Sequence, residues 1–349
     1  MTPRAHVLSA LAGKPVDRIP LTSSAARVPR SQIERDLRNA GLCLVQSGPR
    51  LLETVYHNVV EERLFSGKAG AVFERIRVRT NDGDLCSVVR HASESHTSWT
   101  TERLFKTQRD YRPLMALFGD QRFESDLATF DQAQRDMGED VLLRPNLGAS
   151  PLHYIMHTLM GMEVFAHEWS ERQLEVLKLC KAVAESQHRR VVKIAKAPAL
   201  AITYGGLLNA REISPEQFTK HFLPHLRDFA DVMHSNGKLA GIQLQGDPRN
   251  LAESIAQTHV DYVEGFTDTG FRLEEARRAW PNTTLWLEVP PAVHLLPEDG
   301  VGRWVRDIVK RAQGARVVLS TGALPSDRWS GNLSAIHEAM RATDAVATG

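Results

Sequence analysis

The chain has 349 residues, of which 42% are hydrophobic and 24% charged, a composition ordinary for a soluble globular protein that buries its own core. Its 43 basic and 42 acidic side chains give a formal net charge of +1, which supplies no field for holding nucleic acid or an anionic membrane. No signal-peptide pattern opens the chain and no apolar run approaches the length of a membrane span. We therefore predict a cytoplasmic protein with neither a nucleic-acid nor a membrane partner.

The cysteines also indicate a reducing compartment. Cys43, Cys86 and Cys180 are far apart and show no Cys-x-x-Cys spacing. This pattern is typical of free thiols and not of a disulfide framework or a cysteine-rich zinc site.

In chain order, the first third combines helices with an antiparallel segment. Helices are predicted over residues 3–11, ending at Gly13, and over about 31–39. An alternating run over residues 72–80 leads into Asn81-Asp82-Gly83, and a second alternating run follows. That sequence predicts a β-hairpin, which we interpret as an insertion near residues 56–105.

The remaining two thirds alternate short apolar runs with longer helical patterns. The runs cover residues 141–143, 199–203, 239–244, 260–263, 284–287 and 316–319, and helices are predicted over 163–186, 214–236, 248–258 and 273–280. Such alternation indicates βαβ units and a parallel sheet. We predict a (β/α)8 barrel and a single domain over residues 1–349.

Polar residues follow the predicted strands, where barrel active sites lie. They are Arg144, Asn146, Tyr204, Gln243, Gln245, Glu264, Glu288 and Ser320, followed by Thr321. Each one alone is as well explained by a strand cap or a loop contact. As a set they predict one polar pocket for a small-molecule substrate.

Glu264 and Glu288 end two neighbouring predicted strands. Two such carboxyl groups can divide acid and base roles, hold a metal, or bind a cationic substrate. A salt bridge to Arg144 is an equally good interpretation. His294 can join them in a metal site, or lie on a surface loop.

His153 and His157 have i, i+4 spacing and are expected on one helix face. No glutamate follows the first histidine as in the zinc-protease motif. The helix begins after a predicted strand end, so its N-terminus favours an anionic ligand group. Nucleotide-binding and serine-nucleophile motifs are lacking.

Several segments together resemble the uroporphyrinogen decarboxylase superfamily, which includes methylcobalamin:coenzyme M methyltransferases and corrinoid-dependent demethylases. They are residues 11–20, 98–100 with 106–111, 150–152 with Gly161, 213–218, 223–224, 236–238 and 332–336. The resemblance covers nearly the whole chain and implies the barrel fold of that superfamily.

The resemblance also has gaps at functional positions. Where the methyltransferase branch carries a His-x-Cys zinc motif, this chain has Gln243 and Gln245, and Ala323 replaces the last zinc cysteine. Amides are poor zinc ligands beside imidazole and thiolate. The arginine motif of the decarboxylase branch is missing near residues 23–27, and His157 replaces a tyrosine. The chain is therefore expected to hold no zinc and not to turn over uroporphyrinogen.

The leading hypothesis is a methyltransferase-like enzyme that performs corrinoid-linked methyl transfer or demethylation of a small methylated substrate. It binds no cofactor tightly, and a separate protein presents the corrinoid, because the chain has no Asp-x-His-x-x-Gly motif. The alternative is a cofactor-free decarboxylase or lyase on a small carboxylate, with His157, Glu264 and Glu288 as the proton-transferring residues. A non-catalytic ligand-binding barrel is the third hypothesis, and a homodimer is left open.

Overall fold

The structure is a computed structural model that describes residues 1–68, 71–92, 97–325 and 327–347. It divides into two compact units. Unit 1 comprises residues 1–51, 127–148 and 195–349, and unit 2 comprises residues 52–126 and 149–194. The single domain expected over residues 1–349 stays a prediction.

Unit 1 is built on a nine-stranded sheet in the order β10-β11-β12-β13-β14-β15-β1-β2-β9, with parallel pairing from β11 round to β9. The strands are β1 (Leu21–Ser24), β2 (Cys43–Gln46), β9 (Val141–Leu143), β10 (Asn146–Ala149), β11 (Ala201–Asn209), β12 (Leu239–Gln245), β13 (Tyr262–Phe266), β14 (Thr284–Glu288) and β15 (Val317–Ser320).

The two ends of this sheet are consecutive pieces of one segment. Only Arg144 and Pro145 separate β9 from β10, and the Thr203 amide of β11 donates to the Pro145 carbonyl at 3.0 Å. The sheet is therefore curled back on itself, and the fold is TIM-barrel-like α/β, as the alternating pattern predicts.

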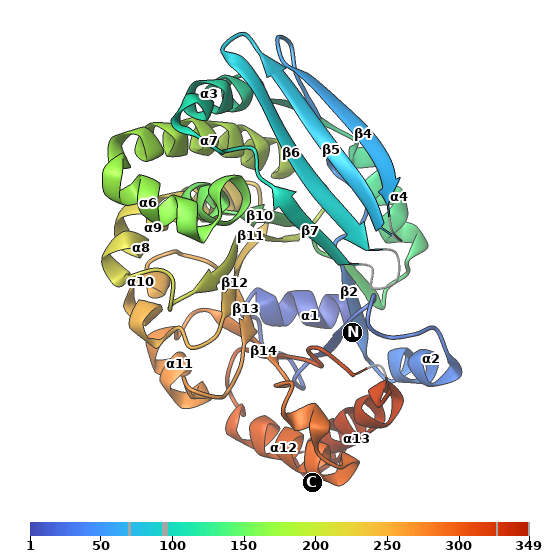
Figure 1. The fold of residues 1–349 in the computed structure, drawn as a ribbon. Coiled ribbons are helices and arrows are strands. Elements are labelled where there is room, and N and C mark those ends of the chain that lie inside the picture. The colour runs from blue at the N-terminus through green and yellow to red at the C-terminus, as the bar shows by residue number, and fades with distance from the viewer. Residues whose placement is uncertain (69–70, 93–96, 326, 348–349) are drawn as a thin grey trace. The chain divides into compact units, whose positions relative to one another are not determined.

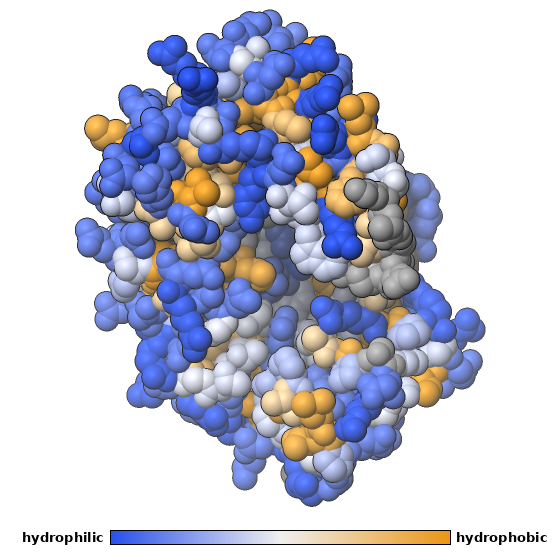
Figure 2. Space-filling model, viewed as in Figure 1, coloured by the Kyte–Doolittle hydropathy of each residue, from blue (hydrophilic) through white to orange (hydrophobic). Residues whose placement is uncertain are grey.

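Helices cover the outside of this sheet (Figure 1). In unit 1 these covering elements are α2 (Gln32–Asn39), α4 (Leu127–Asp136), α8 (Pro215–His221), α9 (Leu223–Ser235), α10 (Ala252–Ala256), α11 (Leu273–Ala279), α12 (Glu298–Arg311), α13 (Trp329–Ala347) and the 3-10 turns η3 (Arg249–Leu251) and η4 (Val293–Leu295), whereas α1 (Pro3–Leu11) packs against the strands from the interior. The helix predicted over 214–236 is divided into α8 and α9, because Pro224 cannot donate a backbone hydrogen bond within a continuous helix. Over α10 and α11 the surface is mostly hydrophilic in Figure 2.

An apolar layer fills the interior of the curled sheet. Its buried residues come from α1 and from six of the strands: Val7, Ala10, Leu11, Cys43, Leu142, Ala201, Tyr262, Trp286 and Val318. The Thr284 hydroxyl ties α1 to β14 by donating to the Ala10 carbonyl at 2.8 Å. At Gly241 a Cβ atom would lie 2.0 Å from the Tyr262 ring, so only glycine leaves room for that ring.

Unit 2 contains two antiparallel sheets and a helical layer. The strands are β3 (Leu52–Val55) with β8 (Arg122–Ser125), and β4 (Val60–Lys68), β5 (Ala71–Thr80), β6 (Gly83–Ala92) and β7 (Thr97–Glu102). The helices are η1 (Gln108–Asp110), α3 (Tyr111–Asp120), α5 (Pro151–Tyr154), the π-helical turn η2 (Ile155–Met160), α6 (Met162–Glu171) and α7 (Gln173–Ile194). The helix predicted over 163–186 is therefore interrupted at Arg172.

The hairpin predicted around Asn81 and Asp82 is present as β5 and β6, which pair from Thr80 and Gly83 outwards. It forms the centre of a four-stranded sheet, because β4 and β7 add to its two edges. Residues 69–70 and 93–96 of the predicted insertion lie outside the described residues.

Among the described helices, none combines the length and the apolar character that crossing a membrane requires.

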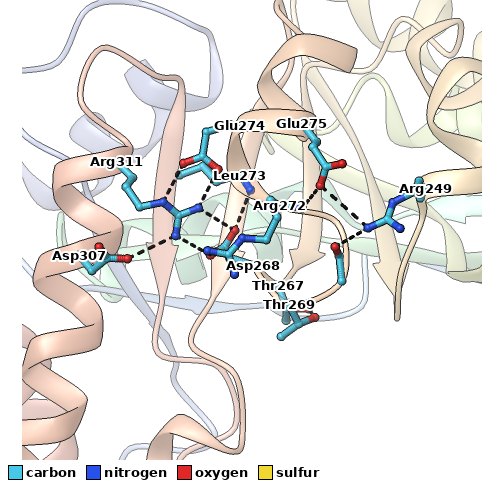
Figure 3. A network of polar contacts seen from close by, with 11 residues as sticks. Arg249, Thr267, Asp268, Thr269, Arg272, Leu273, Glu274, Glu275, Asp307 and Arg311 are labelled. Carbon is cyan, nitrogen blue, oxygen red and sulfur yellow. Dashed lines mark hydrogen bonds and ion pairs between the residues drawn. The ribbon is translucent and has the colours of Figure 1, made fainter.

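The loop that leaves β13 is held by a buried carboxylate (Figure 3). Asp268, whose side chain is 1% exposed, accepts from Arg311 at 2.7 and 3.2 Å and from the Leu273 amide at 2.7 Å. Arg272 contacts the same carboxylate at 3.2 Å. The network fixes the β13–α11 connection to α12, and so holds the end of the strand that carries Glu264.

Candidate functional site

The strand ends of unit 1 enclose a cavity of about 400 Å³. Six strands and the segment after β9 supply its wall. The lining residues are Thr22, Ser23, Ser24, Ala25, Ala26, Val45, Gln46, Ser47, Arg144, Gln243, Glu264, Trp286, Glu288 and Ser320. The wall thus combines hydroxyl, amide and carboxyl groups with one arginine and one large aromatic ring.

Glu264 is the more deeply buried of the two carboxyl groups in this wall, at 7% exposure. Arg144 Nε lies 3.1 Å from its Oε1, and the Thr203 hydroxyl donates to its Oε2 at 3.3 Å. Burial raises the pKa of Glu264, while the Arg144 charge and the Thr203 hydrogen bond act in the opposite direction. Glu264 and Arg144 therefore form an internal pair.

Arg144 is held on three sides. Besides Glu264, its Nη1 donates to the Thr203 hydroxyl, and its guanidinium carbon lies 5.7 Å from the Trp286 ring centroid. The Trp286 indole N–H donates in turn to Thr22 Oγ1 at 2.9 Å, which fixes the ring. These contacts position the arginine before any ligand enters.

Glu288 lies one strand away from Glu264 and has a different environment. Burial raises its pKa, the charge of Glu264 raises it further, and the exposed Arg27 acts against both. Within the described part of the chain, no side chain forms an ion pair or hydrogen bond with the Glu288 carboxyl. Glu288 is thus available to take up a proton or to contact a ligand.

Two further polar groups of the wall lie next to these carboxyl groups in the sheet. Gln243 pairs in register with Glu264, and Ser320 pairs with Glu288. Ser320 Oγ accepts from the Gly322 amide at 3.2 Å, which leaves its hydroxyl hydrogen for another acceptor. The wall can therefore both donate and accept hydrogen bonds.

The cavity contains five of the residues predicted from the strand ends. Arg144, Gln243, Glu264, Glu288 and Ser320 all line it. Their catalytic and substrate-binding roles stay predictions. The salt bridge anticipated between Arg144 and a strand-end glutamate is present at Glu264.

Three other strand-end residues lie outside this cavity wall. The Tyr204 ring packs 5.1 Å from Phe229 of α9, because alternation along β11 turns Thr203 inwards and Tyr204 towards the helices; a substrate-binding role for Tyr204 stays a prediction. Gln245 is exposed at the end of β12. Asn146 is exposed, and its side chain accepts from the Gly148 amide at 2.8 Å.

His294 does not join the two glutamates. Its Nε2 donates to the Thr321 carbonyl at 2.6 Å, and its Nδ1 lies 3.3 Å from the Asn332 amide nitrogen. The side chain is fully buried, and burial lowers its pKa. Both ring nitrogens are engaged in the protein interior, so the suggested cluster of Glu264, Glu288 and His294 as a metal site is wrong.

His153 and His157 belong to unit 2, on α5 and η2. Their ring centroids lie 4.6 Å apart, so the predicted placement on one helix face is confirmed. Their roles in catalysis and substrate binding stay predictions.

The wall residues from β1, β2 and the interior of β14 were not among the predicted site residues. Thr22, Ser23 and Ser24 belong to a strand of only four residues, and Trp286 lies two residues before a strand end. Gln46 and Ser47 show the same sequence pattern as the predicted strand-end residues, because the apolar run 42–45 is followed directly by polar residues and Gly48. That pattern could have located the β2 end of the cavity.

The sequence model of the uroporphyrinogen decarboxylase family matches residues 119–341, well over half of the chain. The chain belongs to the uroporphyrinogen decarboxylase family. This confirms the resemblance inferred from the scattered segments. The region matched by the uroporphyrinogen decarboxylase model includes every strand of the curled sheet except β1 and β2.

Among solved structures, the chain is similar to a methyltransferase from Methanosarcina mazei with a TM-score of 0.59. The match covers 97% of this chain and 99% of that one, at 11% sequence identity. At this identity the likeness shows the fold. No curated protein sequence matches the chain.

Proposed function

We propose that this family member is a methyltransferase-like enzyme that removes a methyl group from a small substrate bound in the cavity. The observation that carries the proposal is a wall with one internally paired carboxyl group, Glu264, and a second, Glu288, that has no hydrogen bond or ion pair within the described part of the chain. Such a wall orients a polar substrate through hydroxyl, amide and carboxyl contacts. The likeness in fold to a methyltransferase supports the same reaction class.

The finer parts of the proposal concern the acceptor and the fold. We infer that a corrinoid carried by a separate protein accepts the methyl group, and that the curled sheet is the closed (β/α)8 barrel of the family. The joining of β9 and β10 through Arg144 and Pro145 supports eight strands in the closed barrel, since β9 and β10 then count as one. A cytoplasmic location and a possible homodimer belong to the same set of predictions.

We further propose that methyl transfer proceeds without zinc. The donor set at the family's zinc positions does not fit the metal, because Gln243 offers only an amide, Gln245 lies exposed past the wall, and Ala323 has no ligand atom. Elemental analysis of the purified protein should find well under one zinc per chain. About one tightly held zinc per chain would contradict this proposal.

A second candidate is a cofactor-free decarboxylase, which the raised pKa of Glu288 favours. In that reaction the bond between the carboxyl carbon and its neighbour breaks, and the electron pair stays on the neighbouring carbon. A protonated Glu288 then donates its proton to that carbon while carbon dioxide leaves. Porphyrinogen substrates are not expected in either case.

The two candidates are separated by one pair of assays on the full chain. The protein is incubated with a panel of small methylated compounds and free cob(I)alamin, and transfer is followed by the cobalamin absorption spectrum. Release of carbon dioxide from small carboxylates is measured in parallel. We expect methyl transfer that falls at least tenfold in Glu288→Gln and is unchanged in Glu253→Gln, a surface control on α10. Carbon dioxide release without methyl transfer would instead support the decarboxylase.

A further inference from the structure

We infer that the substrate is an onium compound, a quaternary ammonium or a sulfonium, whose positive charge lies against Glu288. The inference rests on the proposed function, because it names the class of methylated substrate that this cavity takes. It follows from the charges of the wall, from the surfaces beside Glu288, and from the chemistry of the leaving group.

Among the described residues, one acid of the cavity wall forms no ion pair. Among the lining residues, Arg144 is the one cation, and Glu264 and Glu288 are the acids. Arg144 already contacts Glu264 at 3.1 Å and Thr203, and packs over Trp286. Arg144 is therefore the ion-pair partner of Glu264. Ionised Glu288 then gives the described wall an excess of one negative charge, which a monocation neutralises.

The apolar part of the cavity wall that contains Glu288 suits methyl groups. Trp286 lies two residues earlier on the same strand, so both side chains face the cavity. Val45, Ala25 and Ala26 add apolar surface to the wall. A carboxylate beside an aromatic ring and small apolar side chains is how proteins recognise cations whose charge is covered by methyl groups.

Binding of a cation is linked to the protonation of Glu288. Burial and the charge of Glu264 raise the pKa of Glu288, while the charge of Arg27 lowers it; Arg144, on the same cavity wall, is paired with Glu264. A bound cation favours the ionised carboxylate and draws the pKa of Glu288 back down. Binding must therefore release a proton where Glu288 is protonated in the free protein, and affinity must fall as the pH falls.

The leaving group of an onium substrate needs no acid. When the bond between the methyl carbon and nitrogen or sulfur breaks, its electron pair stays on the nitrogen or sulfur. The product is a neutral amine or thioether, and the methyl group passes to the electron pair of the proposed acceptor. An ionised Glu288 thus serves this reaction as the binding group for the charge, and no metal is required to activate the leaving group.

The test is a calorimetric titration of the full chain with choline and with its neutral isostere, 3,3-dimethylbutan-1-ol. We expect choline to bind at least tenfold more tightly than the alcohol at pH 7.5, and to lose at least tenfold in Glu288→Gln. The surface variant Glu253→Gln should bind like wild type. In two buffers of different ionisation enthalpy, and in a series of titrations from pH 7.5 down to pH 4.5, choline binding should release protons at the acidic end in wild type and none in Glu288→Gln.

Equal binding of choline and the alcohol, or choline binding that Glu288→Gln leaves unchanged, would overturn the onium assignment. Neither result bears on methyl transfer itself, which the cobalamin assay measures with uncharged methyl ethers and thioethers included in the panel. Transfer from those neutral donors with no preference for choline retains the proposed function and removes this inference. Preferential choline binding without any methyl transfer would retain the onium assignment and contradict the proposed function.

Discussion

Two acidic side chains close to strand ends of unit 1, Asp268 and Glu288, have opposite surroundings. Asp268, after β13, receives contacts from Arg311, Arg272 and the Leu273 amide. Glu288, at the end of β14, has no ion pair or hydrogen bond among the described residues, although burial raises its pKa. Figure 3 shows how completely the Asp268 carboxylate is surrounded.

We propose that the difference separates a carboxylate that stabilises the fold from one that serves a ligand. A buried carboxylate with several fixed donors stabilises the fold, and its loss leaves cations unpaired. A buried carboxyl group without protein partners costs stability wherever it is ionised, so stability alone gives no reason to retain it. Substitutions at the two residues should therefore have opposite effects on stability and on binding.

The largest effect is expected at Asp268. Asp268→Asn should lower the free energy of unfolding by about 3 kcal/mol, because Arg311 and Arg272 lose a buried counterion. Asp307→Asn is the matched control: its contact with Arg311 is 3.3 Å and its side chain is 62% exposed, so we expect a change within about 0.5 kcal/mol. Urea unfolding measures both. Similar losses of unfolding free energy in Asp268→Asn and Asp307→Asn would contradict a special structural role for Asp268.

A smaller loss is expected at Arg144. Arg144→Gln should cost about 2 kcal/mol at pH 7, because Glu264 remains buried without a counterion. The pKa of Glu264 then rises further. Glu264 therefore favours the folded state only where it is protonated, at low pH, and this contribution to stability is lost as the pH rises. The destabilisation should thus be greater at pH 7.5 than at pH 5 in urea unfolding. A loss independent of pH would show that the arginine acts through packing.

Glu288→Gln is expected to act in the opposite direction. The folded-state pKa of Glu288 is raised, so wild type loses stability as the pH increases above the ordinary glutamate value and through that raised pKa. The glutamine variant lacks this loss. It should be more stable than wild type at pH 7.5, by on the order of 1 kcal/mol, and nearly equal near pH 4.5. A destabilised variant at pH 7.5 would mean that Glu288 is a structural residue.

The smallest effect is expected at Arg27, which is exposed and acts on Glu288 only through its charge. Arg27→Gln should change the free energy of unfolding by less than about 0.5 kcal/mol. It should raise the pKa of Glu288 slightly, and so shift the pH dependence of choline binding to higher pH. Added salt should reduce the difference between variant and wild type. A large, salt-independent change would place Arg27 in direct contact with the site.

Local patterns in the sequence were enough to predict the family, most strands and five of the wall residues. Strand ends are visible because apolar runs of β11 to β15 stop at turn residues, and parallel strands bring their ends to one face. The segments shared with the family are likewise short and local. Strands of four residues, such as β1, are too short to show a period.

Only the tertiary structure decided which polar side chains enter the cavity and which partners they have. The inward position of Thr203 and the outward position of Tyr204 depend on how β11 packs against α9, which one strand's pattern does not fix. Glu264 differs from Glu288 because Arg144, from the segment between β9 and β10, forms an ion pair with Glu264. Trp286 is held by Thr22, 264 residues away in the chain. The sequence determines that acids stand at strand ends, whereas burial and distant partners determine which of them is paired among the described residues.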